Sequence, residues 1–154
     1  MCIRDSYDGV EPSGNSSVTN VFLRLRSYGL SPEFYSDAQR ILRSFAPHLK
    51  QAGVSFSAML GALHFSLSEP KEIIISGRRG DPETEALLKE VRSEFHPNIV
   101  VAFVENGESP ETEKIIPLAS GRVMVNERAT AYVCQNQTCQ LPVHSIKELR
   151  KLLN

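Results

Sequence analysis

The hydrophobic pattern changes its period once along this chain, at Glu69-Pro70, and that change most constrains the fold. Before it, apolar residues recur every three or four positions, as on one face of a helix. After it, short β-branched runs such as Glu72–Ser76 alternate with helical stretches. The chain therefore predicts a helical part over residues 7–68 and a small α/β part over residues 69–154.

The first part predicts three antiparallel helices joined by short loops. Ser13 or Asn15 can cap the first helix, because their side-chain oxygens accept the free N–H groups of a helix start. Ser31-Pro32 starts the second helix, and Pro47 ends or kinks it, since proline lacks the N–H. Three such helices leave apolar faces uncovered unless something else packs on them. In chain order, the expected apolar stripes are Val18, Val21, Phe22, Leu25 and Tyr28; Phe34, Ala38, Ile41, Leu42 and Phe45; and, on a helix over roughly 55–67, Phe56, Met59, Leu60, Leu63 and Leu67.

The second part predicts a β-α-β unit followed by a strand and a helix. Buried strands are expected at Glu72–Ser76, Ile99–Val104 and Thr130–Cys134. Asp81-Pro82 is a typical helix start, Ile115–Leu118 predicts a short edge strand, and the last helix runs from Ser145 to Leu153. The predicted fold class is mixed α/β, with three helices followed by a small, mostly parallel β-α-β-β-α segment.

Charge and composition restrict the partners. The net charge is −1 and no basic block is present, which argues against nucleic acid or an anionic membrane as main partner. The longest apolar runs, such as Ile73–Ile75, are too short to span a bilayer, and the N-terminal residues lack a signal-peptide core. Three cysteines without framework spacing suit a reducing cytosol. The sequence predicts a cytoplasmic chain without a cofactor.

Two stretches together resemble a known family. Asp8-Gly-Val-Glu-Pro-Ser-Gly-Asn-Ser16, and Tyr132-Val-Cys-Gln135 with Cys139 and Pro142-Val143, resemble the C-terminal end of spermatogenesis-associated, thioredoxin-domain-containing proteins and their bacterial relatives. The resemblance runs from about Tyr7 to Asn154. Residues 1–6 belong to no periodic element, and we expect them to be an extraneous leader.

The resemblance implies that the chain is a fragment. Members of that family are several times longer and carry an N-terminal thioredoxin-like domain, followed by an (α/α)₆ toroid of six helical hairpins. That toroid is similar to N-acylglucosamine 2-epimerases and glycosidases. By this resemblance, residues 7–68 would be the last toroid helices, and their partner would be the missing N-terminal part. The parent would act on a carbohydrate-like substrate or in thiol redox, and this piece alone would not complete the reaction.

Asp8 and Glu11 are the candidate catalytic residues. The resemblance places their loop near the mouth of the toroid, where paired carboxylates serve as general acid and base in sugar chemistry. Turn chemistry gives the competing interpretation, in which Asp8, Ser13 and Asn15 cap a turn or helix start. As a binding site, the same loop would use Ser13 and Asn15.

Cys134 and Cys139, with His144 after them, give the spacing C-x₄-C-x₄-H. Tetrahedral zinc needs a fourth donor that is not nearby, and a thioredoxin-type pair has two intervening residues rather than four. The pattern favours two buried packing residues, because cysteine often behaves as a small hydrophobe. The alternatives are a reversible disulfide, and hence a small thiol-redox module, or part of a metal site.

The loop Gly77-Arg-Arg-Gly-Asp-Pro82 joins a strand to a helix, where α/β proteins often bind phosphate. Arg78 and Arg79 are therefore candidate anion ligands for an independent α/β ligand-binding module. Neither glycine-rich phosphate motif is present, and Asp81 would put a negative charge where the anion should lie. Two solvated arginines are the competing interpretation.

Overall fold

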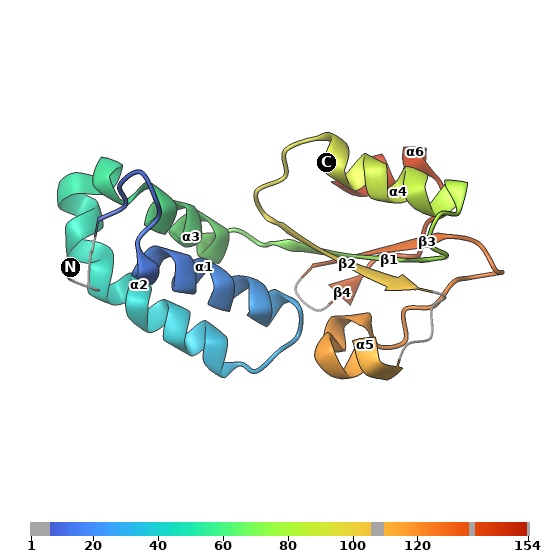
Figure 1. The fold of residues 1–154 in the computed structure, drawn as a ribbon, viewed down its shortest axis with the longest axis horizontal. Helices are drawn as coiled ribbons and strands as arrows, with labels where there is room; N and C mark the ends of the chain where they lie inside the picture. The colour runs from blue at the N-terminus through green and yellow to red at the C-terminus, as the bar shows by residue number, and fades with distance from the viewer. Residues whose placement is uncertain (1–6, 106–109, 136–137, 154) are drawn as a thin grey trace. The chain divides into compact units, whose positions relative to one another are not determined.

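The computed structural model of the chain describes residues 7–105, 110–135 and 138–153 (Figure 1). The expected leader, residues 1–6, lies outside the described residues. The chain divides into two compact units, Met1–Ser68 and Glu69–Asn154. The first is helical and the second is a mixed α/β segment, so the predicted fold class is confirmed.

The helical unit follows the predicted order of three helices, α1 (Gly14–Ser27), α2 (Glu33–Ala52) and α3 (Ser57–Leu67), with a 3-10 turn over Gly53–Phe56 before α3. Ser13 caps α1, because its Oγ accepts a hydrogen bond from Ser16 N at 3.2 Å. Pro47 does not end α2, which continues to Ala52.

The buried side of α1 differs from the expected stripe. Its buried residues are Ser16, Thr19 and Leu23, whereas Val21 on the predicted apolar stripe is 51% exposed. The expectation that Val21 faces the core is thus wrong within this chain. The side of α1 that packs against α2 and α3 carries small polar groups that form local hydrogen bonds. Thr19 Oγ1, for example, donates to Asn15 O at 2.7 Å.

The α/β unit contains a four-stranded sheet in the order β2-β1-β3-β4. Its strands are β1 (Lys71–Gly77), β2 (Ile99–Glu105), β3 (Thr130–Gln135) and β4 (Thr138–Cys139). β1 and β2 are parallel and are connected through α4 (Pro82–Ser93), as the predicted β-α-β unit requires. β3 runs antiparallel to β1, and β4 pairs antiparallel with β3, so the sheet is mixed rather than mostly parallel.

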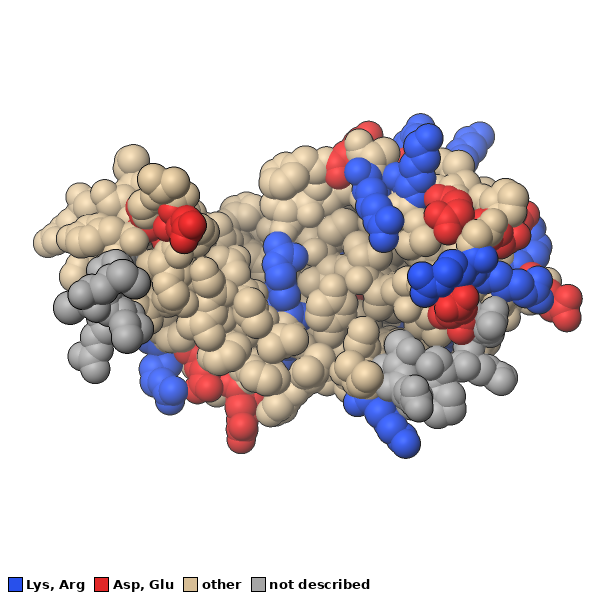
Figure 2. All heavy atoms as spheres, viewed as in Figure 1, with Lys and Arg blue, Asp and Glu red and all other residues tan. Residues whose placement is uncertain are grey.

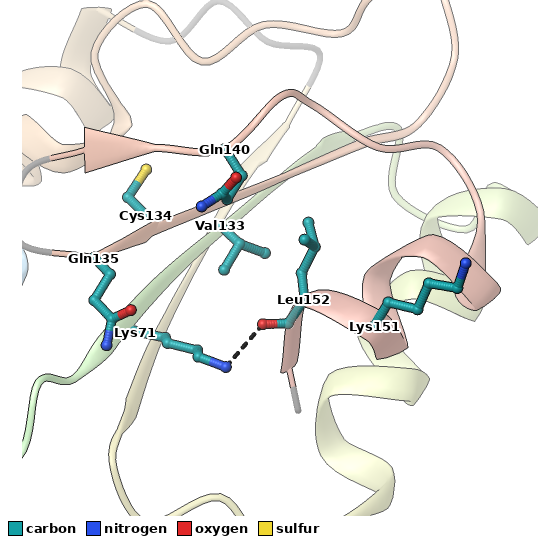
Figure 3. A pocket seen from close by; sticks show the side chains of 7 residues that line it. All are labelled: Lys71, Val133, Cys134, Gln135, Gln140, Lys151 and Leu152. Carbon is teal, nitrogen blue, oxygen red and sulfur yellow. Dashed lines mark hydrogen bonds between the residues drawn. The ribbon is translucent and has the colours of Figure 1, made fainter.

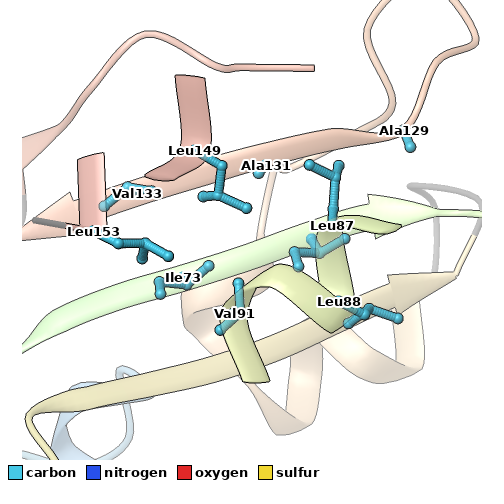
Figure 4. Close-up of a cluster of buried hydrophobic side chains, with 10 residues drawn as sticks. Ile73, Leu87, Leu88, Val91, Ala129, Ala131, Val133, Leu149 and Leu153 are labelled. Atoms are coloured by element: carbon cyan, nitrogen blue, oxygen red, sulfur yellow. The ribbon is translucent and has the colours of Figure 1, made fainter. Parts of the chain in front are cut away.

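One face of this sheet packs against α4 and α6 (Ile146–Leu153), and Figure 4 shows the resulting core. Alternate strand residues point into it, because side chains of a strand alternate between the two faces. The cluster consists of Ile73, Ile75, Leu87, Leu88, Val91, Ala129, Ala131, Val133, Leu149 and Leu153. Tyr132 and Cys134, which lie between these positions on β3, therefore point to the opposite face.

The segment before β3 is not the predicted edge strand. Residues 110–115 form α5 (Pro110–Ile115), and a 3-10 turn follows over Pro117–Ala119. The expected strand over Ile115–Leu118 is therefore wrong. Pro117 explains the failure, because proline cannot donate to a β-ladder but is accepted in the first turn of a helix.

An ion pair joins the two helices that cover the sheet. Arg150 on α6 donates to both carboxylate oxygens of Glu90 on α4, from Nε at 2.7 Å and from Nη2 at 2.9 Å. The Arg150 hydrogen bond holds the pKa of the Glu90 carboxyl below its usual value. This bidentate geometry fixes the orientation of α6 relative to α4.

Candidate functional site

Asp8 binds the start of α3, far along the sequence. Its Oδ2 accepts hydrogen bonds from Ala58 N at 2.8 Å and Met59 N at 3.1 Å, and its Oδ1 accepts one from Ser13 N at 2.8 Å. The residue that precedes α3, Phe56, provides no side-chain cap. Asp8 therefore acts as the N-cap that α3 lacks in its own sequence, and it places a negative charge at the positive end of the helix.

The electrostatics of Asp8 suit an acceptor rather than a general acid. Burial would raise its pKa, but hydrogen bonds from Ser13 N, the Ser16 hydroxyl, Met59 N and Ala58 N outweigh it, so the pKa is lowered. A general acid at neutral pH needs a raised pKa.

The other predicted residues of this loop differ in exposure. Glu11 is exposed, Ser13 is buried as the α1 cap, and Asn15 is half-buried. Of the four candidates, the structure brings Asp8 and Ser13 together, through Asp8 Oδ1 and Ser13 N. The geometry of this loop supports the capping interpretation that the sequence offered beside the catalytic one.

The Arg78–Arg79 loop carries its own carboxylates. Arg79 reaches Glu105 Oε2 at 3.4 Å and lies 5.9 Å from the Phe103 ring centre. Gly80 N donates to Glu85 Oε1 at 3.3 Å. The Arg79 guanidinium and the Gly80 N–H, two of the groups that could bind an anion, are thus already paired with side chains of the same unit. The Arg78 side chain is exposed.

The first turn of α4 is filled by protein groups as well. Asp81 is the N-cap, as predicted, and its Oδ2 accepts from Thr84 N at 3.0 Å and from Thr84 Oγ1 at 3.1 Å. Arg78 N in turn donates to Thr84 Oγ1 at 3.2 Å. A phosphate would have to displace the Asp81 carboxylate from the position that it occupies, which gives no support to anion binding here.

Cys134 and Cys139 lie opposite each other on β3 and β4, and their sulfur atoms form a disulfide. The favoured prediction of two packing cysteines is therefore wrong, and the structure contains the disulfide that the sequence left as an alternative. Cys134 is 1% exposed, whereas Cys139 on the short edge strand is half-buried. The His144 Nδ1 lies 3.1 Å from Ala129 O and 3.3 Å from Thr130 Oγ1. The described residues include no group of three or more potential ligands that could hold a metal ion.

Arg122 is the residue at this disulfide that the sequence did not reveal. It lies in the irregular segment before β3, and its Nη2 lies 3.0 Å from Cys139 Sγ. Its guanidinium is 5.7 Å from the Tyr132 ring centre, and its Nε is buried without a hydrogen-bond partner. No sequence signal marks it, because a lone arginine in a loop is usually solvated and the contact spans seventeen positions.

A hollow of about 200 Å³ opens beside Cys134 (Figure 3). Its wall includes Lys71 at the start of β1 and Leu152 near the end of α6. Lys71 Nζ donates to Leu152 O at 2.9 Å and to Leu153 O at 2.8 Å. The lysine thus satisfies two of the carbonyl groups that a helix end leaves without partners. Its charge also complements the negative end of the helix.

Replacing Lys71 by methionine is expected to lower the free energy of unfolding of the α/β unit by about 1 kcal/mol, because both carbonyl bonds and the charge at the helix end disappear. Lys151→Met is the matched control, since Lys151 is an exposed lysine in the last turn of α6, and its loss removes a charge at the helix end but neither carbonyl bond. Urea unfolding of both variants checks the prediction. Equal stability of the two variants would contradict it.

Comparison with known proteins gives homologues along nearly the whole chain. Over 152 residues, 99% of this chain, it is 32% identical to human spermatogenesis-associated protein 20, and the match covers 19% of that protein. The mouse protein of that name gives the same identity over the same length. An uncharacterized protein of Caenorhabditis elegans is 27% identical over 157 residues, which cover 97% of this chain and 20% of that protein.

These homologues confirm the spermatogenesis-associated part of the resemblance seen in the sequence. No family profile matches the chain, and no solved structure does. Among the described residues, no helix combines the length and apolar character needed to cross a membrane. The chain spans about a fifth of the length of the relatives above, at 19% of the human protein. It is thus homologous, over 99% of its length, to one segment of spermatogenesis-associated protein 20.

Proposed function

We propose that this chain is a structural segment of a longer protein, and that its helical unit packs against the part of that protein that precedes it. The observation that carries the proposal is the exposure of the apolar side of α1. Its buried side is Ser16, Thr19 and Leu23, while Val21 on the apolar stripe is 51% exposed. Amphipathic helices normally bury the apolar side, so this arrangement supports a cover outside this chain.

α3 supports the same proposal. The helix carries apolar residues on all of its faces, as is typical of helices that are buried on all sides. Met59, Ala62 and Phe65 are buried, yet Leu60 is 39% and Leu67 is 77% exposed. Figure 2 shows few charged side chains on the visible face of the helical unit, whereas acidic and basic residues are interspersed over the α/β unit. Exposed leucines on a weakly charged surface are typical of an interaction site.

The family resemblance suggests what the missing cover is. We propose that α1–α3 are the last helices of an (α/α)₆ toroid and that the α/β unit follows it, in a cytoplasmic protein with an N-terminal thioredoxin-like domain. A carbohydrate-like substrate would then be bound by helices outside this chain, and catalysis would need the whole protein. Reading the coding sequence upstream of Tyr7 tests this: an in-frame helical region is expected, and a stop codon there would contradict it.

Polar substitutions at the exposed apolar positions test the missing cover directly. Leu60→Gln and Leu67→Gln are expected to leave the stability of the isolated chain within about 0.5 kcal/mol, because neither position is buried in it. Both should reduce the binding of an apolar fluorescent dye and weaken association with the polypeptide encoded upstream. Met59→Gln is the control: Met59 is 0% exposed, so this variant should lose several kcal/mol, on the order of 3.

The disulfide favours a second function, and we propose that Cys134 and Cys139 form a reversible redox pair. The supporting observation is their bond between β3 and β4 in a chain whose composition suits a reducing compartment. Thiol counting after treatment with dithiothreitol, and again after oxidised glutathione, tests this. In the Cys2→Ser chain, which keeps only this pair, two thiols should appear and then disappear, and two thiols that stay free would contradict the proposal.

A further inference from the structure

We propose that Cys139 is the sulfur that exchanges with small disulfides and thiols, and that Arg122 stabilises its thiolate. This inference rests on the proposed reversibility of the Cys134–Cys139 disulfide and assigns a separate role to each sulfur. It predicts an asymmetric pair, with one reactive and one resolving cysteine.

The surroundings of the two sulfurs carry the assignment. Cys139 lies on the two-residue edge strand β4 and is half-buried, whereas Cys134 is 1% exposed within β3. An incoming molecule therefore meets Cys139 first. Disulfide exchange depends on such access and on the thiolate fraction of the attacking sulfur.

Arg122 provides the charge at Cys139. Its Nη2 is 3.0 Å from Cys139 Sγ, within reach of a charge-assisted hydrogen bond to a thiolate. Within the described part of the chain, no carboxylate forms an ion pair with Arg122. The Tyr132 hydroxyl beside it donates to Val123 O at 2.6 Å, and burial raises the pKa of this hydroxyl, so Tyr132 stays neutral. The positive charge is therefore available to Cys139.

The chemistry is a pair of thiol–disulfide exchanges. The Cys139 thiolate attacks one sulfur of a small disulfide RSSR, forms a mixed disulfide and releases RS⁻, which takes a proton from water. Cys134 then loses its proton to solvent, attacks the Cys139 sulfur and releases the second RS⁻. Two protein thiols are oxidised and one RSSR is reduced to two RSH. In the reverse direction, Cys139 leaves last, as the thiolate beside Arg122.

Reaction of single-cysteine variants with oxidised glutathione tests the assignment. The full 154-residue chain is used with Cys2→Ser throughout, because Cys2 lies outside the described residues. Cys134→Ser, which keeps Cys139, should form the glutathione adduct about tenfold faster than Cys139→Ser. Adding Arg122→Gln should slow the Cys139 adduct about tenfold, whereas Arg122→Lys should retain most of the rate. Mass spectrometry follows the adduct, and circular dichroism checks that each variant folds.

Arg128→Gln is the matched control, because Arg128 is an arginine of the same segment whose side chain is 53% exposed and pairs with Glu83. It should leave the adduct rate unchanged. Equal rates for the two cysteines, or an unchanged rate in folded Arg122→Gln, would overturn the inference. A chain that keeps both thiols free with oxidised glutathione would instead overturn the reversible disulfide itself.

Discussion

Replacing Asp8 by alanine is expected to lower the free energy of unfolding of the helical unit by about 2 kcal/mol, since α3 loses its N-cap and Ser13 N loses its acceptor. The reporters are the amide hydrogens of Ala58 and Met59, which bond to Asp8 Oδ2 at 2.8 and 3.1 Å. Their exchange should accelerate most, because the cap is their direct partner. Urea unfolding gives the accompanying change in stability.

Glu11→Ala is the control for Asp8→Ala, because Glu11 is an exposed carboxylate of the same loop. Its stability should match that of the unsubstituted chain. A comparable loss in both variants would mean that the loop depends on its total charge rather than on the Asp8 bonds. A second variant at this position tests the catalytic interpretation. If Glu11 acts chemically, Glu11→Gln in the full-length protein should abolish turnover without loss of stability.

The Asp8 cap should also depend on pH. The folded pKa lies below the ordinary value because of the hydrogen bonds, so folding favours the ionised form. Its contribution is complete above the unfolded pKa and is lost as pH falls through the folded pKa. Asp8→Asn removes the titration, so its deficit relative to the unsubstituted chain should shrink in acid.

Local signals made much of the fold predictable. The β-branched runs around Ile73–Ile75 and Ile99–Val104 formed the parallel pair β1 and β2, as expected. Ser13 and Asp81 cap the helices that they were predicted to cap. The caps succeed because each bond spans three residues, so residue type and spacing determine it. The strands succeed because β-branched runs favour an extended backbone wherever their partner strand lies.

Contacts between distant residues were not predictable in the same way. The Asp8 bond to Ala58 spans 50 positions, and no pattern in either stretch specifies it. The direction of β3 depends on the path that the long segment after β2 takes back to the sheet. A single sequence does not determine that path. Arg122 and Lys71 reach their partners across 17 and 81 positions, so their roles at Cys139 and Leu152 follow only from the fold.

Gly77→Ala is expected to lower the free energy of unfolding of the α/β unit by about 3 kcal/mol, because a well-packed site has no room for an extra methyl group. A Cβ at Gly77 would overlap the Oγ1, Cγ2 and Cβ atoms of Thr84. Thr84 cannot turn away at low cost, since it is fully buried and its Oγ1 bonds to both Arg78 N and Asp81 Oδ2. Urea unfolding monitored by circular dichroism measures the loss.

A double-mutant cycle identifies the cause. In the Thr84→Ala background, Gly77→Ala should cost at least about 1 kcal/mol less, because Oγ1 and Cγ2 are gone and only the contact with Cβ is left. Gly61→Ala is the control, since a Cβ there meets nothing within 4 Å. An equal cost of Gly77→Ala in both backgrounds would mean that the strain arises elsewhere in the turn. If Thr84→Ala reduces the loss of stability caused by Gly77→Ala, close packing of its own side chains shapes the β1–α4 turn. Those side chains would then occupy the space that a phosphate-binding loop keeps open for its ligand.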